Sequence, residues 1–348
     1  MMVEEMPKEK RWTLIILIGC LSMFMAEVFA GASQLWFIDP WSLIVTYWLY
    51  LGHLLLFLNL AFRTKRTSIP QLYLWGVLFG LYESWITKVL WFGYPGAEGP
   101  AMGLVGGIAI LEFFTLVFFW HPILAFVMPI LVFEAFAKSQ DSDLVLERKI
   151  FISHLPYLNK KKKKTLVFLI FLILAGSAFL SLNTGYNLPV AALAILGSIV
   201  LIFLFYKISS RRCSNNFSIY TLKLGKKGFS IVIIYLSLLY IITFFLLLPE
   251  RLPTSIIPYL IIIGFYIFIG AILRISKPID ETKIGMREDI EIYDSKFFFR
   301  FFGLLLILVI IFCLIPIIGL IVAIMIFLSL FIIGPIIFVI FLIKALKK

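Results

Sequence analysis

Runs of about twenty consecutive apolar residues recur along almost the whole chain, and each is about the length that a helix needs to cross a bilayer. With 62% hydrophobic and 14% charged residues, the chain cannot hide its apolar surface in a water-soluble core. The sequence therefore predicts an all-α polytopic transmembrane helical bundle. Candidate spans occupy residues 12–31, 41–62, 70–93, 165–183, 188–206, 228–248 and 254–273, and residues 297–346 are long enough for two more.

Residues 101–137 form the one apolar stretch whose number of crossings is ambiguous. At about 1.5 Å per residue the stretch is too long for one helix and barely long enough for two. The bias of basic residues toward the cytoplasm requires an odd number of crossings here. We predict one full crossing plus a re-entrant or broken helix, which gives about ten crossings in all. The break is expected near Trp120, His121, Pro122 or Pro129, because proline interrupts helical hydrogen bonding. Eleven crossings, with one violation of the charge rule, is the alternative.

The net charge of +12 lies in short basic clusters between the apolar runs. Lys160–Lys164, which directly precede an apolar run, are typical of a cytoplasmic loop. This pattern predicts a multi-pass protein of the cell membrane with both termini in the cytoplasm. The same loops are expected to attract anionic lipid headgroups rather than nucleic acid. The sequence names no protein partner.

The composition of the chain changes at about residue 138. All eight tryptophans precede Pro122, and so do most of the charged residues that lie inside apolar runs. We interpret residues 1–138 as a polar-lined, Trp-rich transmembrane module and residues 139–164 as a basic cytoplasmic linker. Residues 165–348 then form an apolar transmembrane module.

Ionisable residues within or beside the apolar runs of the first module are candidates for a functional site, since a buried charge costs several kcal/mol in a bilayer. Counting along each span places four of them at similar depth, between the midplane and the outer third. We predict these four as catalytic residues: Glu27, His53, Glu83 and Glu112. Three more are predicted to line a substrate or ion pathway: Lys88, His121 and Glu134.

Two further residues carry expectations about their partners. Lys88 follows Glu83 by five positions, about 140° around a helix, so the two are not expected to pair. Lys88 is expected either to meet Glu27 or Glu112, or to extend toward the membrane interface. His154 lies in the basic linker and is expected to face solvent.

Metal and cofactor use is left open by the sequence. Cys20, Cys213 and Cys313 lie far apart, with neither a disulfide framework nor a zinc cluster indicated. Ligation of a metal by histidine and glutamate is chemically reasonable, but no closely spaced ligand pair such as HExxH is present.

Three classes of function fit these residues. In an intramembrane enzyme, Glu83 with Glu27 or Glu112 and a histidine activates water for attack on a lipid or lipid-exposed substrate. In a transporter, the same groups form a proton or cation path, although many such proteins contain an internal repeat and none is visible here. In a membrane scaffold or assembly subunit, the aromatic surface of the first module contacts other proteins.

Two short motifs partly resemble the type II CAAX prenyl protease superfamily. Residues 83–88, Glu-Ser-Trp-Ile-Thr-Lys, are similar to its Glu-Glu-x-x-x-Arg motif, and residues 118–121, Phe-Phe-Trp-His, resemble its later histidine motif. The chain departs from the family at Ser84, Lys88 and Val117, and it has no late His-x-x-x-Asn/Asp motif in a span. The resemblance covers about forty of 348 residues and does not place the chain in that family.

Overall fold

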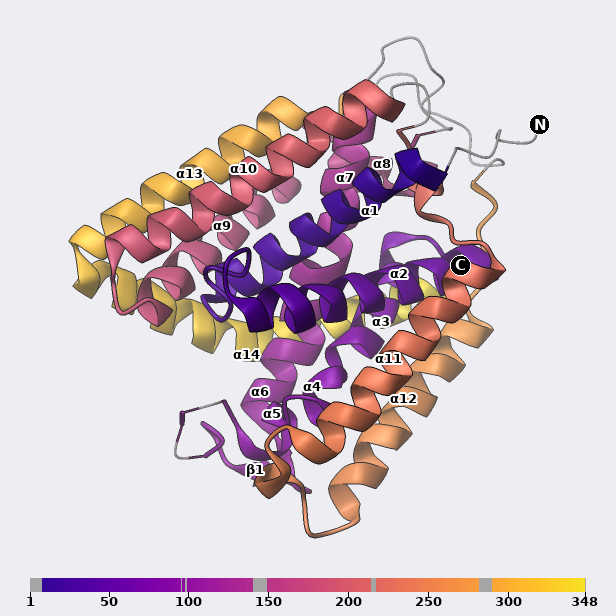
Figure 1. Ribbon diagram of the computed structural model, residues 1–348. Coiled ribbons are helices and arrows are strands. Elements are labelled where there is room, and N and C mark those ends of the chain that lie inside the picture. Colours follow the sequence, from indigo (N-terminus) through magenta and orange to yellow (C-terminus); the bar gives the residue numbers. More distant parts are fainter. Residues whose placement is uncertain are drawn as a thin grey trace. The chain divides into compact units, whose positions relative to one another are not determined.

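The computed structural model describes residues 8–94, 96–97, 99–139, 149–213, 217–281 and 290–347 (Figure 1). The structure is 78% helical with almost no strand, which confirms the all-α class. Within these residues, nine helices are long and apolar enough to cross a membrane. They are Arg11–Val28, Ser42–Thr64, Ile110–Lys138, Lys163–Asn183, Leu188–Cys213, Lys226–Leu246, Ile257–Ile275, Ser295–Leu314 and Pro316–Leu346.

The chain divides into two compact units that interleave along the sequence. Unit 1 contains Met1–Leu51, Met128–Lys223 and Asp280–Ile326, and unit 2 contains Gly52–Val127, Leu224–Ile279 and Phe327–Lys348. Three of the five boundaries fall inside helices, after residues 51, 127 and 326, and two fall outside them, after residues 223 and 279. The compositional division near residue 138 stays a prediction, since the units do not follow it, and residues 140–148 of the linker lie outside the described part.

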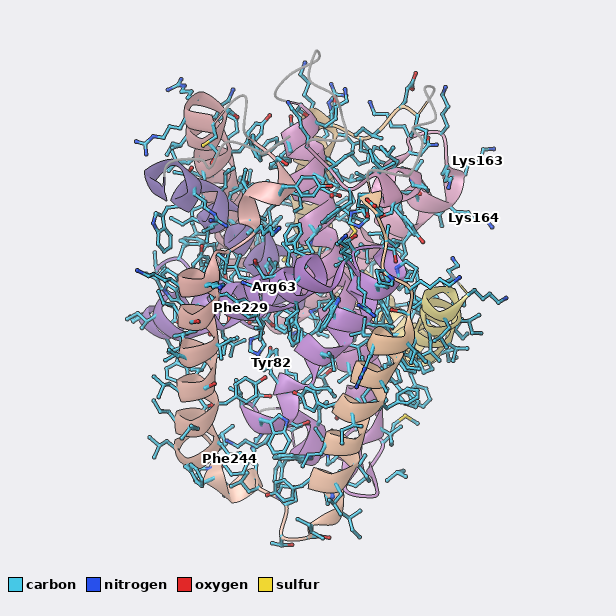
Figure 2. All side chains as sticks on the ribbon, turned by 90° about the vertical axis from the view of Figure 1, so that its right-hand side faces the viewer. Arg63, Tyr82, Lys163, Lys164, Phe229 and Phe244 are labelled. Carbon is cyan, nitrogen blue, oxygen red and sulfur yellow. The ribbon has the colours of Figure 1, made fainter. Side chains whose placement is uncertain are left out.

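In unit 1, α1 (Lys8–Met23) packs against α10 (Leu188–Cys213) and α7 (Met128–Lys138). Helix α13 (Ser295–Leu314) packs against α10 and α9 (Lys163–Asn183), as Figure 1 shows. Small residues permit close approach: a Cβ at Gly176 would lie 2.5 Å from the Phe29 ring. Lys163 and Lys164 extend outward at the start of α9 (Figure 2).

In unit 2, α3 (Ile69–Gly80) packs along the first part of the Ile110–Lys138 helix. Two glycines of α3 make this possible. A Cβ at Gly76 would lie 2.6 Å from the Cα of Pro122, and one at Gly80 would lie 3.2 Å from the Cβ of His121. Backbones therefore meet closely here, which brings the residues after α3 beside His121.

The break in a membrane segment lies elsewhere than the sequence predicts. Residues 70–93 were expected to form one span, but they form α3, α4 (Tyr82–Trp85) and α5 (Val89–Phe92). At about 1.5 Å per residue, the twelve residues of α3 are too short to cross a bilayer alone. Gly80 ends α3, but no proline or glycine marks the break between α4 and α5, so the hydropathy pattern hides that break.

Conversely, residues 101–137 contain no break of the kind predicted. The helix Ile110–Lys138 consists of α6 (Ile110–Glu112), the π-helical stretch Phe113–Val127 and α7, and all its residues except Ile110, Phe114 and Lys138 are buried. The wider hydrogen-bonding pattern of the π-helix accommodates Pro122, which lacks an N–H group. One continuous helix therefore replaces the expected re-entrant element.

The remaining helices of unit 2 border its exposed face. These are α2 (Tyr47–Thr64), of which the part from Gly52 belongs to this unit, α11 (Lys226–Leu246), α12 (Ile257–Ile275) and the end of α14 (Pro316–Leu346). Only 11% of the α11 span and 28% of the α12 span is buried. A two-stranded hairpin, β1 (Leu104–Val105) with β2 (Ile108–Ala109), precedes α6.

Candidate functional site

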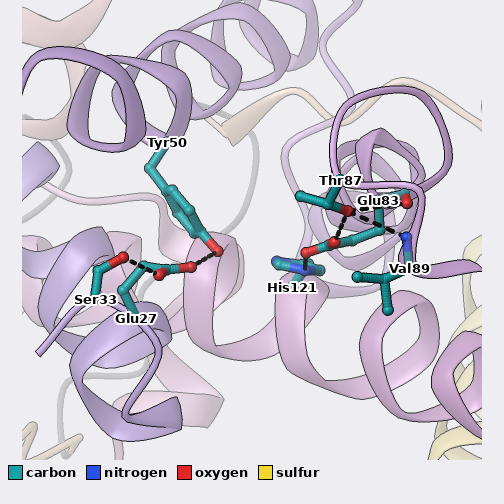
Figure 3. Close-up of polar contacts among 7 residues, drawn as sticks. All are labelled: Glu27, Ser33, Tyr50, Glu83, Thr87, Val89 and His121. Carbon is teal, nitrogen blue, oxygen red and sulfur yellow. Dashed lines mark hydrogen bonds and ion pairs between the residues drawn. The ribbon is translucent and has the colours of Figure 1, made fainter. Parts of the chain in front are cut away.

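A buried carboxylate–imidazole pair lies at the centre of unit 2. Glu83, on α4, contacts His121, in the π-helical stretch, with 2.8 Å between Oε1 and Nε2 (Figure 3). Glu83 is 7% exposed and His121 is 1% exposed. The Thr87 hydroxyl donates to the other carboxylate oxygen, Oε2. Both oxygens of Glu83 are therefore held by side chains, which fixes the orientation of the carboxylate.

An aromatic layer covers one side of this pair. The Phe79 and Tyr82 rings lie 5.7 and 5.0 Å from the His121 ring between centroids. The same two rings lie 4.9 and 5.5 Å from the ring of His53, which stacks nearly parallel to Phe79. His53 and His121 therefore contact the same two aromatic rings.

His53 contributes to a second polar pair. Its Nε2 lies 2.9 Å from the Tyr240 hydroxyl of α11, and His53 is 1% exposed. The two residues border a cavity of about 370 Å³ between α2, α4, α11 and α12. The other lining residues are Leu56, Phe57, Trp85, Ile233, Leu236, Ser237 and Tyr266.

Glu112, at the end of α6, is the fourth predicted catalytic residue, and Tyr94 is a nearby phenol. Burial raises the pKa of the Tyr94 hydroxyl, and the charges of Glu112 and Glu83 raise it further. Both carboxylates therefore lie within electrostatic reach of one phenol. The Ala101 N–H donates to Glu112 Oε1 at 3.0 Å, whereas Oε2 has no hydrogen-bond partner among the described residues. The structure thus brings His53, Glu83 and His121 together around Phe79 and Tyr82, and Glu112 belongs to the same unit.

Comparison with known proteins places the chain in a group without assigning it an activity. A family model described as "Uncharacterized membrane protein family" matches residues 16–347. The chain belongs to this family. It is accordingly an integral membrane protein, as the apolar helices also indicate.

An "Uncharacterized protein" of Archaeoglobus fulgidus is 35% identical over 174 residues, which are 50% of this chain and 50% of the relative. The match thus spans about half the length of that curated relative. No solved structure matches the chain.

Lys88 has a different partner from those expected of it in this membrane protein. The residue is fully buried in a left-handed conformation, with φ at 58°. Its ammonium group donates to the carbonyls of Thr243, at 2.7 Å, and Leu247. These carbonyls end α11, where a cation also complements the helix dipole. Lys88 therefore caps α11.

Glu27 belongs to unit 1 and has its own hydrogen-bond network. It lies in the π-helical turn Phe24–Val28 that follows α1. The Tyr50 hydroxyl donates to Oε1 at 2.5 Å, and the Ser33 hydroxyl donates to Oε2 at 2.6 Å (Figure 3). Its predicted part in a shared catalytic site stays a prediction.

Glu134, also in unit 1, forms a second carboxylate–histidine pair. Its Oε2 lies 2.8 Å from Nδ1 of His154, and its Oε1 accepts from the Phe151 N–H at 2.9 Å. Both side chains are fully buried, so the expectation that His154 faces solvent is wrong. The pair fastens the segment around residues 151–154 to α7, and its closed network is typical of a structural role.

Several residues of the site were missed from the sequence. Thr87 is four positions after Glu83, so helical spacing was a usable signal for it. Tyr240 is 187 positions from His53, and no local pattern connects the two. Within the described ranges, no group of three His, Cys, Asp or Glu side chains is arranged to hold a metal.

Proposed function

We propose that the protein is a membrane-embedded hydrolytic enzyme acting on a lipid or lipid-exposed substrate, with Glu83 and His121 as its acid–base pair. The observation that carries this proposal is the buried contact of 2.8 Å between Oε1 and Nε2. Ionisable side chains held together at this depth are costly to a membrane protein, and such groups commonly serve function.

The geometry suits proton transfer from water. In the tautomer in which the Nε2–H of His121 donates a hydrogen bond to Glu83, the free lone pair of the imidazole is on Nδ1. That nitrogen is then basic and takes a proton from a water that attacks the substrate. The carboxylate stabilises the imidazolium that forms, and the proton passes to the leaving group as its bond breaks.

The proposal can be tested by measuring the lipid composition of cells that express the protein. Membranes from cells that express the wild-type protein, Glu83→Gln or Glu134→Gln are compared by mass spectrometry. Glu134→Gln is the matched control, since it makes the same chemical change in the pair of unit 1. We expect a hydrolysed lipid species with the wild-type protein and Glu134→Gln but not with Glu83→Gln. An identical lipid profile for all three variants would contradict the proposal.

A proton- or cation-coupled transporter is the second candidate. It is favoured by the two titratable pairs of unit 2, Tyr240 with His53 and Glu83 with His121, whose histidines contact the same two aromatic rings. Purified protein in liposomes with an internal pH dye would then show proton flux that His53→Phe and Glu83→Gln each abolish. Flux that survives both substitutions would exclude this path.

The orientation of the chain in the cell membrane is part of the proposal. The lysines at 160–164 support a cytoplasmic location of that loop and its contact with anionic headgroups. In the described part of the chain six spans follow this loop, which keeps the C-terminus on its side. Three spans precede it, so the cytoplasmic N-terminus that we propose requires α3, α4 and α5 together to complete a further crossing. A reporter fused to the C-terminus that is active only in the cytoplasm is expected to be active. Its inactivity would overturn this orientation.

A further inference from the structure

The cavity beside His53 lies against the two most lipid-exposed helices of unit 2. Helix α11 places Ile233, Leu236, Ser237 and Tyr240 on one face toward the cavity, at helical spacing. Its other face carries large exposed apolar side chains, Ile231, Ile234, Leu238 and Ile241 among them. Because these helices are of membrane-spanning length and composition, the medium around the cavity is hydrocarbon.

Helix α11 is attached to its neighbours at both ends. Near its start, the Asn59 side chain accepts from the Leu224 N–H at 2.5 Å, and the Arg63 guanidinium lies 4.2 Å from the Phe229 ring centre. At its end, Lys88 holds the carbonyls of Thr243 and Leu247. Figure 2 shows Arg63 with Phe229 toward one end of α11 and Phe244 toward the other. The cavity borders the part of α11 between these attachments.

The chemistry of the walls specifies an occupant with an apolar body and one polar group. Leu56, Phe57, Ile233 and Leu236 provide apolar surface, and about 370 Å³ lies within the range of about 300–1,000 Å³ that ligand pockets occupy. The polar side chains of the wall are those of histidine, tryptophan, serine and tyrosine, none of which carries a fixed charge. Among the residues that the structure describes, no arginine or lysine lines the cavity to bind a phosphate.

We propose that this cavity binds the hydrocarbon chain of a membrane lipid whose uncharged oxygen group, a carbonyl or hydroxyl, hydrogen-bonds to the His53–Tyr240 pair. The binding of a lipid in this cavity does not depend on the proposed function. The further statement that the bound lipid is the substrate rests on that function. Phe79 and Tyr82 contact the rings of both His53 and His121, so they connect the lipid site to the acid–base pair.

Photochemical labelling of the purified full-length protein in lipid nanodiscs tests the site. The probe is a long-chain monoacylglycerol with a diazirine near the end of its chain, and adducts are mapped by mass spectrometry. We expect adducts on Leu56, Phe57 and Leu236, which excess unlabelled monoacylglycerol suppresses. Adducts confined to the exposed side chains of α11 and α12, or adducts that the competitor leaves unchanged, would overturn the proposal.

Two variants of α11 make the test specific. Ser237→Trp fills part of the cavity, whereas Leu238→Trp places the same side chain on the exposed face of the same helix. We expect Ser237→Trp to abolish labelling inside the cavity and Leu238→Trp to retain it. Equal labelling in both variants would contradict the proposal. Tyr240→Phe, which removes only one hydroxyl, should weaken competition by the unlabelled lipid about 2- to 10-fold.

Binding and turnover can fail independently. Glu83→Gln leaves every lining residue in place, so it should be labelled like the wild-type protein although its hydrolytic activity is lost. Labelling without Glu83-dependent turnover would remove the enzyme proposal and retain the lipid site. Turnover without cavity labelling would do the reverse.

Discussion

At the scale of single residues, the two carboxylate–histidine pairs differ in what surrounds them rather than in their length. Both are 2.8 Å long. Glu134 is satisfied by His154 and a backbone N–H, whereas Glu83 is bound by the side chains of His121 and Thr87. The Glu83 pair also borders the aromatic rings of Phe79 and Tyr82, which His53 contacts in turn. These surroundings favour chemistry at Glu83 and structural support at Glu134.

Glu134→Ala should destabilise unit 1. Removal of the carboxylate leaves His154 and the Phe151 N–H buried without their acceptor, which we expect to cost about 3–5 kcal/mol, as for other broken buried pairs. Thermal unfolding in detergent, followed by tryptophan fluorescence, measures the loss. Glu134→Gln keeps an acceptor oxygen and should lose much less. An unfolding temperature for Glu134→Ala equal to that of the wild-type protein would show that the pair is not structural.

Lys88→Met should release the end of α11. The carbonyls of Thr243 and Leu247 then lose a buried donor, which we expect to cost about 1–3 kcal/mol. Hydrogen exchange of the α11 amides should rise mainly in its last turns. Lys227→Met, near the start of the same helix in an exposed position, is the matched control. Unchanged exchange in Lys88→Met would contradict the capping role.

At the scale of elements, hydropathy located the helices better than their interruptions. The sequence predicted a break in 101–137 because of its prolines, but Pro122 is accommodated by π-helical geometry. It predicted no break in 70–93, where Lys88 adopts a left-handed conformation without being glycine. The contacts of Lys88 with the carbonyls at the end of α11 explain that conformation. A local sequence pattern cannot predict such contacts between distant segments.

Close packing of α3 against the Ile110–Lys138 helix should be sensitive to one methyl group. Gly76→Ala puts a Cβ at 2.6 Å from the backbone of Pro122, so the helices must separate at a cost of about 1–3 kcal/mol. Gly264→Ala is the control, since nothing lies within 4 Å of its Cβ position on α12. We expect Gly76→Ala alone to lower the unfolding temperature and to displace His121 from Glu83. Equal stability of the two variants would argue against this packing.

At the scale of the whole molecule, the class and the candidate residues could be predicted but their pairing could not. Each span is recognisable because the bilayer requires a long apolar helix, whatever its neighbours. Partners across helices depend on the packing: Glu83 meets His121 at a separation of 38 residues, and His53 meets Tyr240 at 187. Each compact unit also consists of three separate segments of the sequence, and no shift of composition along the chain predicts this division.

Incorporation of heavy oxygen from water tests most directly whether Glu83 and His121 activate water. Purified protein is incubated with total membrane lipid in heavy-oxygen water, and the lipid products are analysed by mass spectrometry. The account predicts label in the products of the wild-type protein and of Glu134→Gln, and none above background with Glu83→Gln or His121→Asn. The absence of labelled product from the wild-type protein, or equal labelling by Glu83→Gln, would contradict it.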